Sequence, residues 1–177
     1  HHSIYIRDAD HEILIARYFG LTADGLSYGR DSHVIYAGKV YWLNQESEEL
    51  EEVGDGYTGW AKKLDHIYSV NQTVVDTYLI AVDQLEDGLF ARKVSRIFMD
   101  MWFDLKQDVS KIERHLQRIS RVLGDFNKKQ SNAKDFPAYL FQDVSEDIQV
   151  ALSGTHVLVS RLDALHHYYV SIKNDRL

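Results

Sequence analysis

The first 56 or so residues alternate apolar and polar positions in short runs, a pattern typical of β-strands. Alternating isoleucines over 4–15 surround a polar turn and predict one hairpin. A second hairpin is predicted over 33–43, where Ala37-Gly38 separates two apolar runs. The acidic segment 44–52 and the glycines that follow it are interpreted as a surface loop.

From about residue 57 the apolar residues recur in steps of three and four, which predicts α-helices. Three long helices are expected, at about 58–87, 94–127 and 137–177. Gly88 and the Arg92-Lys93 region are predicted to end the first of them. The last helix carries an unbroken heptad seam, whose residues are Phe141, Val144, Ile148, Ala151, Thr155, Leu158, Leu162, Leu165, Tyr169 and Ile172.

These patterns predict an α+β fold, with a small N-terminal β-rich head at 1–56 and a long-helix bundle at 57–177. The last helix would begin at Pro137, the only proline, and its roughly 40 residues would span about 60 Å. Helices of ordinary domains average about 11–12 residues. We therefore expect a stalk that packs on its neighbours in the chain at one end and against other subunits at the other, with an antiparallel three-helix coiled coil as the alternative.

The composition and the absence of certain motifs exclude several classes of function. The net charge of −7 argues against a nucleic-acid partner, because phosphate binding needs clustered Lys and Arg. The chain has no Cys, which excludes disulfides, thiol catalysis and cysteine zinc sites. Neither a glycine-rich phosphate loop nor a hydrolase motif is present, so we do not expect an enzyme. No apolar run approaches a membrane span, and His1-His2 are interpreted as the remnant of a purification tag.

Two clusters in the last predicted helix contain candidate metal ligands. Asp143, Glu146 and Asp147 share one helix face, where carboxylates could bind a hard cation such as Mg²⁺. Compensation of the helix dipole is the alternative role for these acids. The second cluster consists of Asp163, His166 and His167. Imidazole would favour a softer metal such as Zn²⁺, Co²⁺ or Ni²⁺, and packing at a surface or interface is the alternative for these residues.

Several short motifs occur in a fixed order along the last 110 or so residues. They are Val74-Val75-Asp76-Thr77-Tyr78, Leu85-Glu86-Asp87, Leu105-Lys106-Gln107-Asp108, Arg121-Val122-Leu123, Phe141-Gln142-Asp143-Val144 and the segment 168–177. In that order they resemble the CorA magnesium-transporter family. The first two motifs match its first "willow" helix and the next two match the second. The last two match the beginning of its stalk helix and the end of that helix just before the membrane.

This resemblance implies a cytoplasmic regulatory domain, soluble in isolation and truncated before the first transmembrane helix. The whole protein would be a homopentameric divalent-cation channel of the inner membrane. It would sense intracellular Mg²⁺ between its subunits and close the pore when the ion is bound, with Co²⁺ or Ni²⁺ as other transported ions. Asp143 matches an aspartate of the family's regulatory site. The alternatives are the related zinc-transporting ZntB branch and a cytosolic helical scaffold without a transport role.

Overall fold

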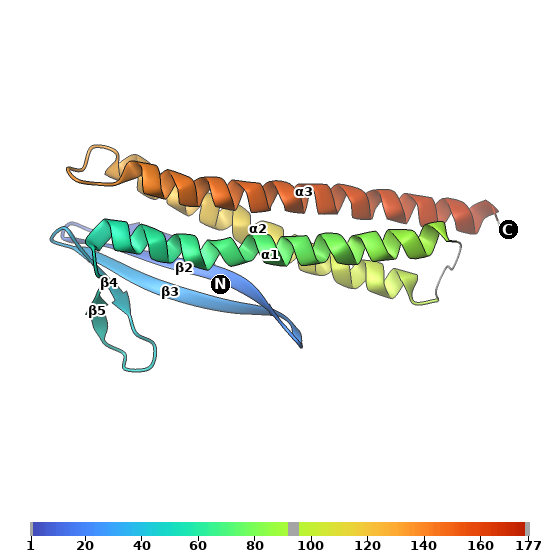
Figure 1. Ribbon diagram of the computed structural model, residues 1–177, viewed down its shortest axis with the longest axis horizontal. Coiled ribbons are helices and arrows are strands. Elements are labelled where there is room, and N and C mark those ends of the chain that lie inside the picture. The colour runs from blue at the N-terminus through green and yellow to red at the C-terminus, as the bar shows by residue number, and fades with distance from the viewer. Residues whose placement is uncertain (1, 92–95, 176–177) are drawn as a thin grey trace.

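The computed structural model describes residues 2–91 and 96–175. A five-stranded antiparallel sheet is followed by three long helices (Figure 1), which confirms the predicted α+β class. The strands, which pair in sequence order, are β1 (Ile4–Arg7), β2 (His11–Thr22), β3 (Gly25–Tyr36), β4 (Lys39–Leu43) and β5 (Leu50–Glu52). The helices are α1 (Gly56–Phe90), α2 (Phe98–Gln130) and α3 (Ala138–Asp175).

One long hairpin, β2–β3, forms the centre of the sheet. Its two 12-residue strands stay in register from the pair His11↔Tyr36 to the pair Thr22↔Gly25. The alternation pattern predicted only the ends of this hairpin, as parts of two smaller ones. The segment 44–52 was interpreted as a loop, and this is wrong at its end, because β5 pairs with β4. An exposed acidic edge strand of three residues carries little apolar signal.

Helices α1 and α2 end later along the chain than the pattern predicted. Helix α1 continues through Gly88 to Phe90, so the predicted break at Gly88 is wrong. A single glycine costs a helix only about 1 kcal/mol relative to alanine, and the flanking heptad residues still pack. The predicted break at Arg92-Lys93 and the predicted start at 94 lie outside the described residues. Helix α2 runs to Gln130, beyond the expected end at 127.

The hydrophobic core continues from the sheet into the bundle. Helix α3 packs along both α1 and α2, and the inner face of the sheet covers one half of the helices (Figure 1). Gly154 allows a close approach, because a Cβ atom there would lie 2.7 Å from Val75 Cγ1 of α1. Near the α2–α3 loop an aromatic cluster of Trp60, Phe126 and Phe141 joins all three helices. The predicted division into two domains at residue 56 stays a prediction.

The three helices are long, but their composition is mixed. Each carries charged side chains on the faces turned away from the core. Across residues 2–91 and 96–175, no helix has a stretch apolar enough to cross a membrane. Helix α3 is therefore stabilised along its length by heptad packing against α1 and α2, and not by a continuous run of apolar residues.

Candidate functional site

The first predicted metal cluster lies near the beginning of α3. Pro137 precedes the helix, and its carbonyl oxygen accepts a hydrogen bond from the backbone N–H of Leu140, 3.0 Å away. Asp143 and Glu146 are exposed on the side of α3 that faces away from the core. The side chain of Gln142 donates a hydrogen bond of 3.4 Å to Glu146. These carboxylates are therefore accessible to an ion or to a second protein chain.

Asp147 lies at the boundary between α3 and α1. The carboxyl group of Asp65, on α1, shares a hydrogen bond with the carboxyl group of Asp147. This hydrogen bond raises the pKa of Asp147, and partial burial and the negative charge of Asp65 raise it further. A small cavity of about 150 Å³ beside the pair is lined by Tyr68, Ser69, Gln72, Asp147 and Val150. Asp147 is exposed like Asp143 and Glu146, but it differs from them because its carboxyl group interacts with Asp65 of another helix.

The second predicted cluster, further along α3, is divided among separate contacts. Asp163 forms an ion pair with Lys106 of α2 at 2.7 Å. The ring of His166 packs on Trp102 with a centroid distance of 4.9 Å, and the Trp102 indole donates a 2.7 Å hydrogen bond to the carbonyl oxygen of Leu162. His167 is exposed. Within the described part of the chain, no three His, Asp or Glu side chains converge on a position for a metal ion.

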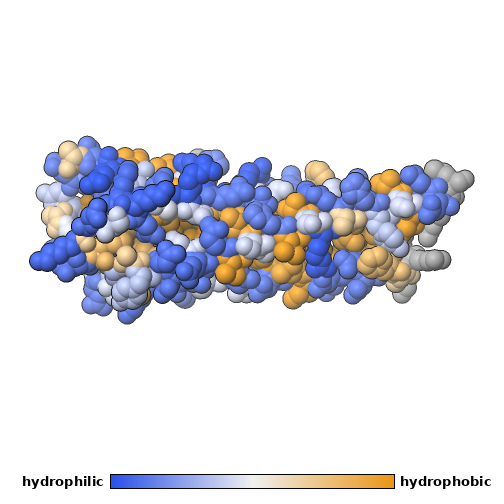
Figure 2. Space-filling model, turned by 90° about the horizontal axis from the view of Figure 1, so that it is seen from above, coloured by the Kyte–Doolittle hydropathy of each residue, from blue (hydrophilic) through white to orange (hydrophobic). Residues whose placement is uncertain are grey.

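A second heptad stripe runs along the outer face of α3, opposite the predicted seam. All of its members are exposed, and most are small or apolar. They are Tyr139, Asp143, Glu146, Val150, Ser153, Val157, Ser160, Ala164, His167 and Ser171. Val150 and Val157 are 59% and 52% exposed. Hydrophobic side chains also gather on the helical half of the molecule in Figure 2. We name this stripe the outer seam, and we name the predicted apolar seam from Phe141 to Ile172 the inner seam. The heptad spacing of the outer seam is present in the sequence, but the inner seam is the stronger apolar signal.

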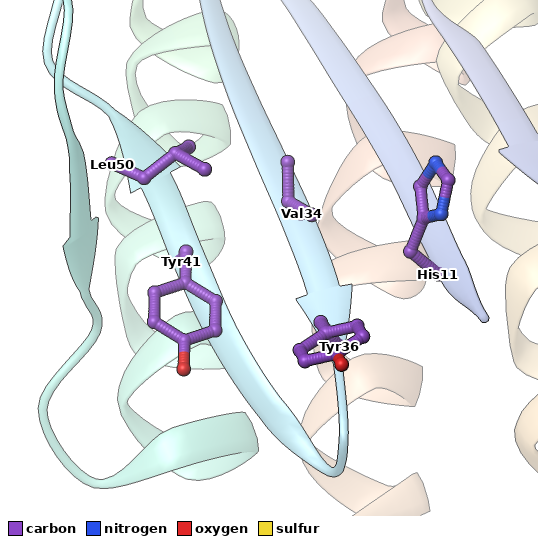
Figure 3. A pocket seen from close by; sticks show the side chains of 5 residues that line it. All are labelled: His11, Val34, Tyr36, Tyr41 and Leu50. Atoms are coloured by element: carbon purple, nitrogen blue, oxygen red, sulfur yellow. The ribbon is translucent and has the colours of Figure 1, made fainter.

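The outer face of the sheet carries an open apolar groove of about 410 Å³. Figure 3 shows its side chains on the side of the sheet that faces away from the helices. They come from four strands and are His11, Val34, Tyr36, Tyr41 and Leu50. The sequence pattern indicated strands at Val34, Tyr36 and Tyr41 but could not indicate which of their two faces would be covered.

One buried histidine on the inner face of the sheet was not singled out by sequence. His33 has no exposed surface, and its ring lies 5.3 Å from the Trp60 ring, measured between centroids. Neither ring nitrogen of His33 has a hydrogen-bond partner among residues 2–91 and 96–175. Burial, aided by the positive charge of Lys63, lowers the pKa of His33 to about 3. The imidazole is therefore neutral at physiological pH, and because it has no exposed surface it packs inside the core.

Comparison with known proteins places the chain by fold. No protein-family model matches it, and no curated protein matches it in sequence. Its structure is similar to that of the CorA magnesium transporter from Methanocaldococcus jannaschii, with a TM-score of 0.75 and 14% identity over 98% of this chain. This chain covers 59% of that transporter chain.

Two further solved structures give the same result. The cytoplasmic domain of ZntB from Vibrio parahaemolyticus matches 99% of this chain with a TM-score of 0.72 and 10% identity, and 74% of that chain is covered. The soluble domain of the M. jannaschii CorA matches 96% with a TM-score of 0.67 and 14% identity, and 73% of it is covered. The expected resemblance is confirmed as a fold: the chain folds like the soluble domain of CorA and the cytoplasmic domain of ZntB.

Proposed function

We propose that this chain is the cytoplasmic domain of a CorA-type divalent-cation transporter and that it regulates the pore without catalysing a reaction. The observation that carries this proposal is the whole-length match to a CorA transporter, which includes the sheet and all three helices over 98% of the chain. In this assignment α3 is the stalk, and its C-terminal end points toward the first membrane span. The domain would lie on the cytoplasmic face of the inner membrane.

The outer seam supports a homo-oligomer, which we propose to be a pentamer. Heptad spacing on an exposed helix face is the pattern by which one helix packs against another, and small residues such as Ser153 and Ala164 permit close approach. Burying the exposed parts of Val150 and Val157 would contribute about 1 kcal/mol for each side chain. Copies of α3 from neighbouring subunits are the partners that this seam fits.

The same seam supports metal sensing between subunits. Asp143 and Glu146 lie on it, and among residues 2–91 and 96–175 neither belongs to a group of three ligands that could hold a metal ion. Carboxylate oxygens are the ligands that Mg²⁺ prefers, and Mg²⁺ keeps several water ligands, so one or two carboxylates from each subunit suffice. Adjacent carboxylates repel one another unless a cation neutralises them. Mg²⁺ would therefore favour the assembly that brings them together, which we take to be the closed pore.

A ZntB-type zinc transporter is the second candidate, since the ZntB cytoplasmic domain matches the chain almost equally well. Limited proteolysis of the chain during titration with Mg²⁺ or Zn²⁺ would separate the two. Protection by Mg²⁺ that requires Asp143 and Glu146 supports the CorA-type function. Protection by Zn²⁺ alone, lost when His167 is replaced by Ala, supports the zinc transporter instead.

The reading frame of the gene beyond Leu177 tests the transporter assignment itself. We expect an apolar run of about 20 residues shortly after Leu177, long enough to cross a bilayer. A polar continuation or a stop codon would contradict the transporter function and would leave a cytosolic scaffold as the remaining function.

A further inference from the structure

We propose that the free edge of β5 and the outer face of the sheet bind an extended protein segment in which basic and apolar residues alternate. The segment would add to the sheet as a further strand beside β5. Its apolar side chains would pack at the margin of the apolar groove, which we name the sheet groove and which is lined by His11, Val34, Tyr36, Tyr41 and Leu50. This interaction goes beyond the proposed function and does not depend on it, because it involves the sheet and not α3.

The sheet groove is part of an apolar face that the helices leave uncovered. The strand register places Ile13, Val34 and Tyr41 in one row across β2, β3 and β4. Tyr36 and Leu50 are 54% and 53% exposed, and Figure 3 shows both on the side of the sheet that faces away from the helices. A contiguous patch of exposed apolar side chains marks a surface that another molecule covers.

Strand β5 offers backbone groups to such a molecule. It is the last strand in the order of the sheet, so one of its edges has no neighbouring strand among residues 2–91 and 96–175. The backbone N–H of Val53, just after β5, donates a 2.8 Å hydrogen bond to the carbonyl oxygen of Val40 in β4. Because the backbone groups of a strand alternate between its two edges, those of Leu50 and Glu52 point away from β4. An extended segment can pair with these groups by strand addition.

The charge of this part of the chain favours a basic partner. Residues 1–55 contain 11 acidic and 4 basic residues, whereas residues 56–177 contain 16 of each, so the whole net charge of −7 lies in the first part. Five of the acids are the glutamates of 46–52, and all five are exposed. Within the described part of the chain only Glu52 among them forms an ion pair, with Lys39 at 3.6 Å. Complementary charge speeds association and selects partners, so this surface fits a segment rich in Lys or Arg.

The two faces of β5 determine the pattern of the partner. Leu50 lines the sheet groove, whereas Glu49 and Glu51 lie on the opposite face of the strand, because successive side chains alternate. A partner with the same period of two would place apolar side chains beside Leu50 and basic side chains beside the glutamates. A second copy of this chain fits less well, since pairing β5 with β5 would bring glutamates opposite one another, and like charges across a sheet are destabilising.

NMR titration of the 177-residue chain with synthetic peptides tests this proposal. The probe is a blocked eight-residue peptide that alternates Lys and Val, at about 0.05 M salt. We expect saturable shifts of the β5 amide signals and slower hydrogen exchange at Leu50 and Glu52. A peptide with the same residues in two blocks, Lys first and Val second, should bind about tenfold more weakly, because it cannot match both faces of β5. A peptide that alternates Glu and Val should not bind.

Substitution of Leu50 tests the apolar part of the surface. Leu50→Thr keeps a residue that is common in strands and should weaken binding of the Lys-Val peptide about fivefold, because apolar contact area is lost. Leu21→Thr is the matched control, since Leu21 is 42% exposed near the other end of the long hairpin. Unchanged melting temperatures, followed by circular dichroism, would establish that both variants keep the fold.

Charge reversal tests the acidic part of the surface. Glu49→Lys/Glu51→Lys should weaken binding of the Lys-Val peptide about tenfold at about 0.05 M salt, because attraction is replaced by repulsion on the strand that pairs with the peptide. Asp100→Lys/Asp104→Lys makes the same change of net charge at exposed positions of α2. These positions lie at the end of the bundle away from the sheet (Figure 1), so this control should bind the peptide almost as the wild-type chain does.

Three results would overturn the inference. The first is equal binding of the alternating and the block peptide, which would mean that net charge alone is recognised. The second is an equal loss of binding in the Asp100→Lys/Asp104→Lys control, or shifts that map to the helices. The third is self-association of the chain that Leu50→Thr abolishes, without peptide binding, because the surface would then contact a second copy. None of these results bears on the proposed transport function.

Discussion

Burial of His33 should make this fold sensitive to acid. Its imidazole is fully buried between the sheet and α1, and burial followed by the positive charge of Lys63 lowers its pKa from 6.5 to about 3. In the unfolded chain His33 therefore binds a proton below about pH 6.5, whereas in the folded chain it binds one only below about pH 3. Because the unfolded state binds more protons in this window, the free energy of unfolding falls as the pH falls.

The size of the effect follows from the two pKa values. One pKa unit corresponds to about 1.4 kcal/mol, so His33 should contribute a loss of about 3 kcal/mol between roughly pH 7.5 and pH 4.5. The loss would approach about 5 kcal/mol below pH 3. Against a total stability of about 5–15 kcal/mol for a domain, such a loss is large enough to measure.

Urea unfolding followed by circular dichroism at a series of pH values measures this contribution. We compare the wild-type chain with His33→Leu, which keeps a buried apolar side chain and removes the titrating group. The stability difference between the two proteins should shift by about 3 kcal/mol in favour of the variant on acidification to about pH 4.5. His66→Leu, at an exposed position of α1, is the control and should keep the wild-type pH dependence. Parallel pH profiles for wild type and His33→Leu would refute the reasoning.

Three further predictions concern α3. Gly154→Leu should destabilise the fold by about 1–3 kcal/mol in urea unfolding, because a side chain there meets Val75 of α1. Asp65→Asn should lower the pKa of Asp147, measured by NMR titration, because the amide removes the shared proton and the negative charge that raise it. Val157→Cys, on the outer seam, should form disulfide-linked species between subunits when the whole protein is oxidised in its membrane, since α3 helices would face one another there.

Matched substitutions separate these effects from general damage. Gly124→Ala should stabilise the chain by about 0.5–1 kcal/mol, because a Cβ atom at that helix position meets nothing within 4 Å. Lys62→Cys, on the exposed side of α1, should cross-link much less than Val157→Cys. An increase in stability for Gly154→Leu, an unchanged pKa in Asp65→Asn, or equal cross-linking at both cysteines would each contradict the corresponding argument.

The helices were predictable because their apolar spacing is regular over many turns. The apolar spacing of the inner seam from Phe141 to Ile172 can be read directly in the sequence, and the face of α3 that packs against the core consists mainly of these residues. The long β2–β3 hairpin was only partly predictable. Alternation holds at its ends, whereas Phe19 is buried against α1 out of step with Leu14 and Ala16. A twisted hairpin that crosses a helix changes which residues it buries, and a period of two cannot indicate this.

The candidate site depended more strongly on tertiary contacts. Sequence spacing placed Asp143, Glu146 and Asp147 together on one helix face, and all three are exposed, but only the fold brings Asp65 of α1 to Asp147. His33 showed no sequence signal, because one histidine in a strand is equally compatible with a surface position. Whether the predicted acids and histidines bind a metal stays a prediction.

Ion flux through the whole protein tests the central claim most directly. The protein would be reconstituted into liposomes, and Mg²⁺ entry would be followed with an enclosed fluorescent indicator while Mg²⁺ on the cytoplasmic side is varied. We predict a divalent-cation flux that falls as cytoplasmic-side Mg²⁺ rises. In the variant Asp143→Asn/Glu146→Gln, a higher Mg²⁺ concentration should be needed to stop the flux. The absence of flux for Mg²⁺, Co²⁺, Ni²⁺ and Zn²⁺ alike would contradict the assignment of this chain to a divalent-cation transporter.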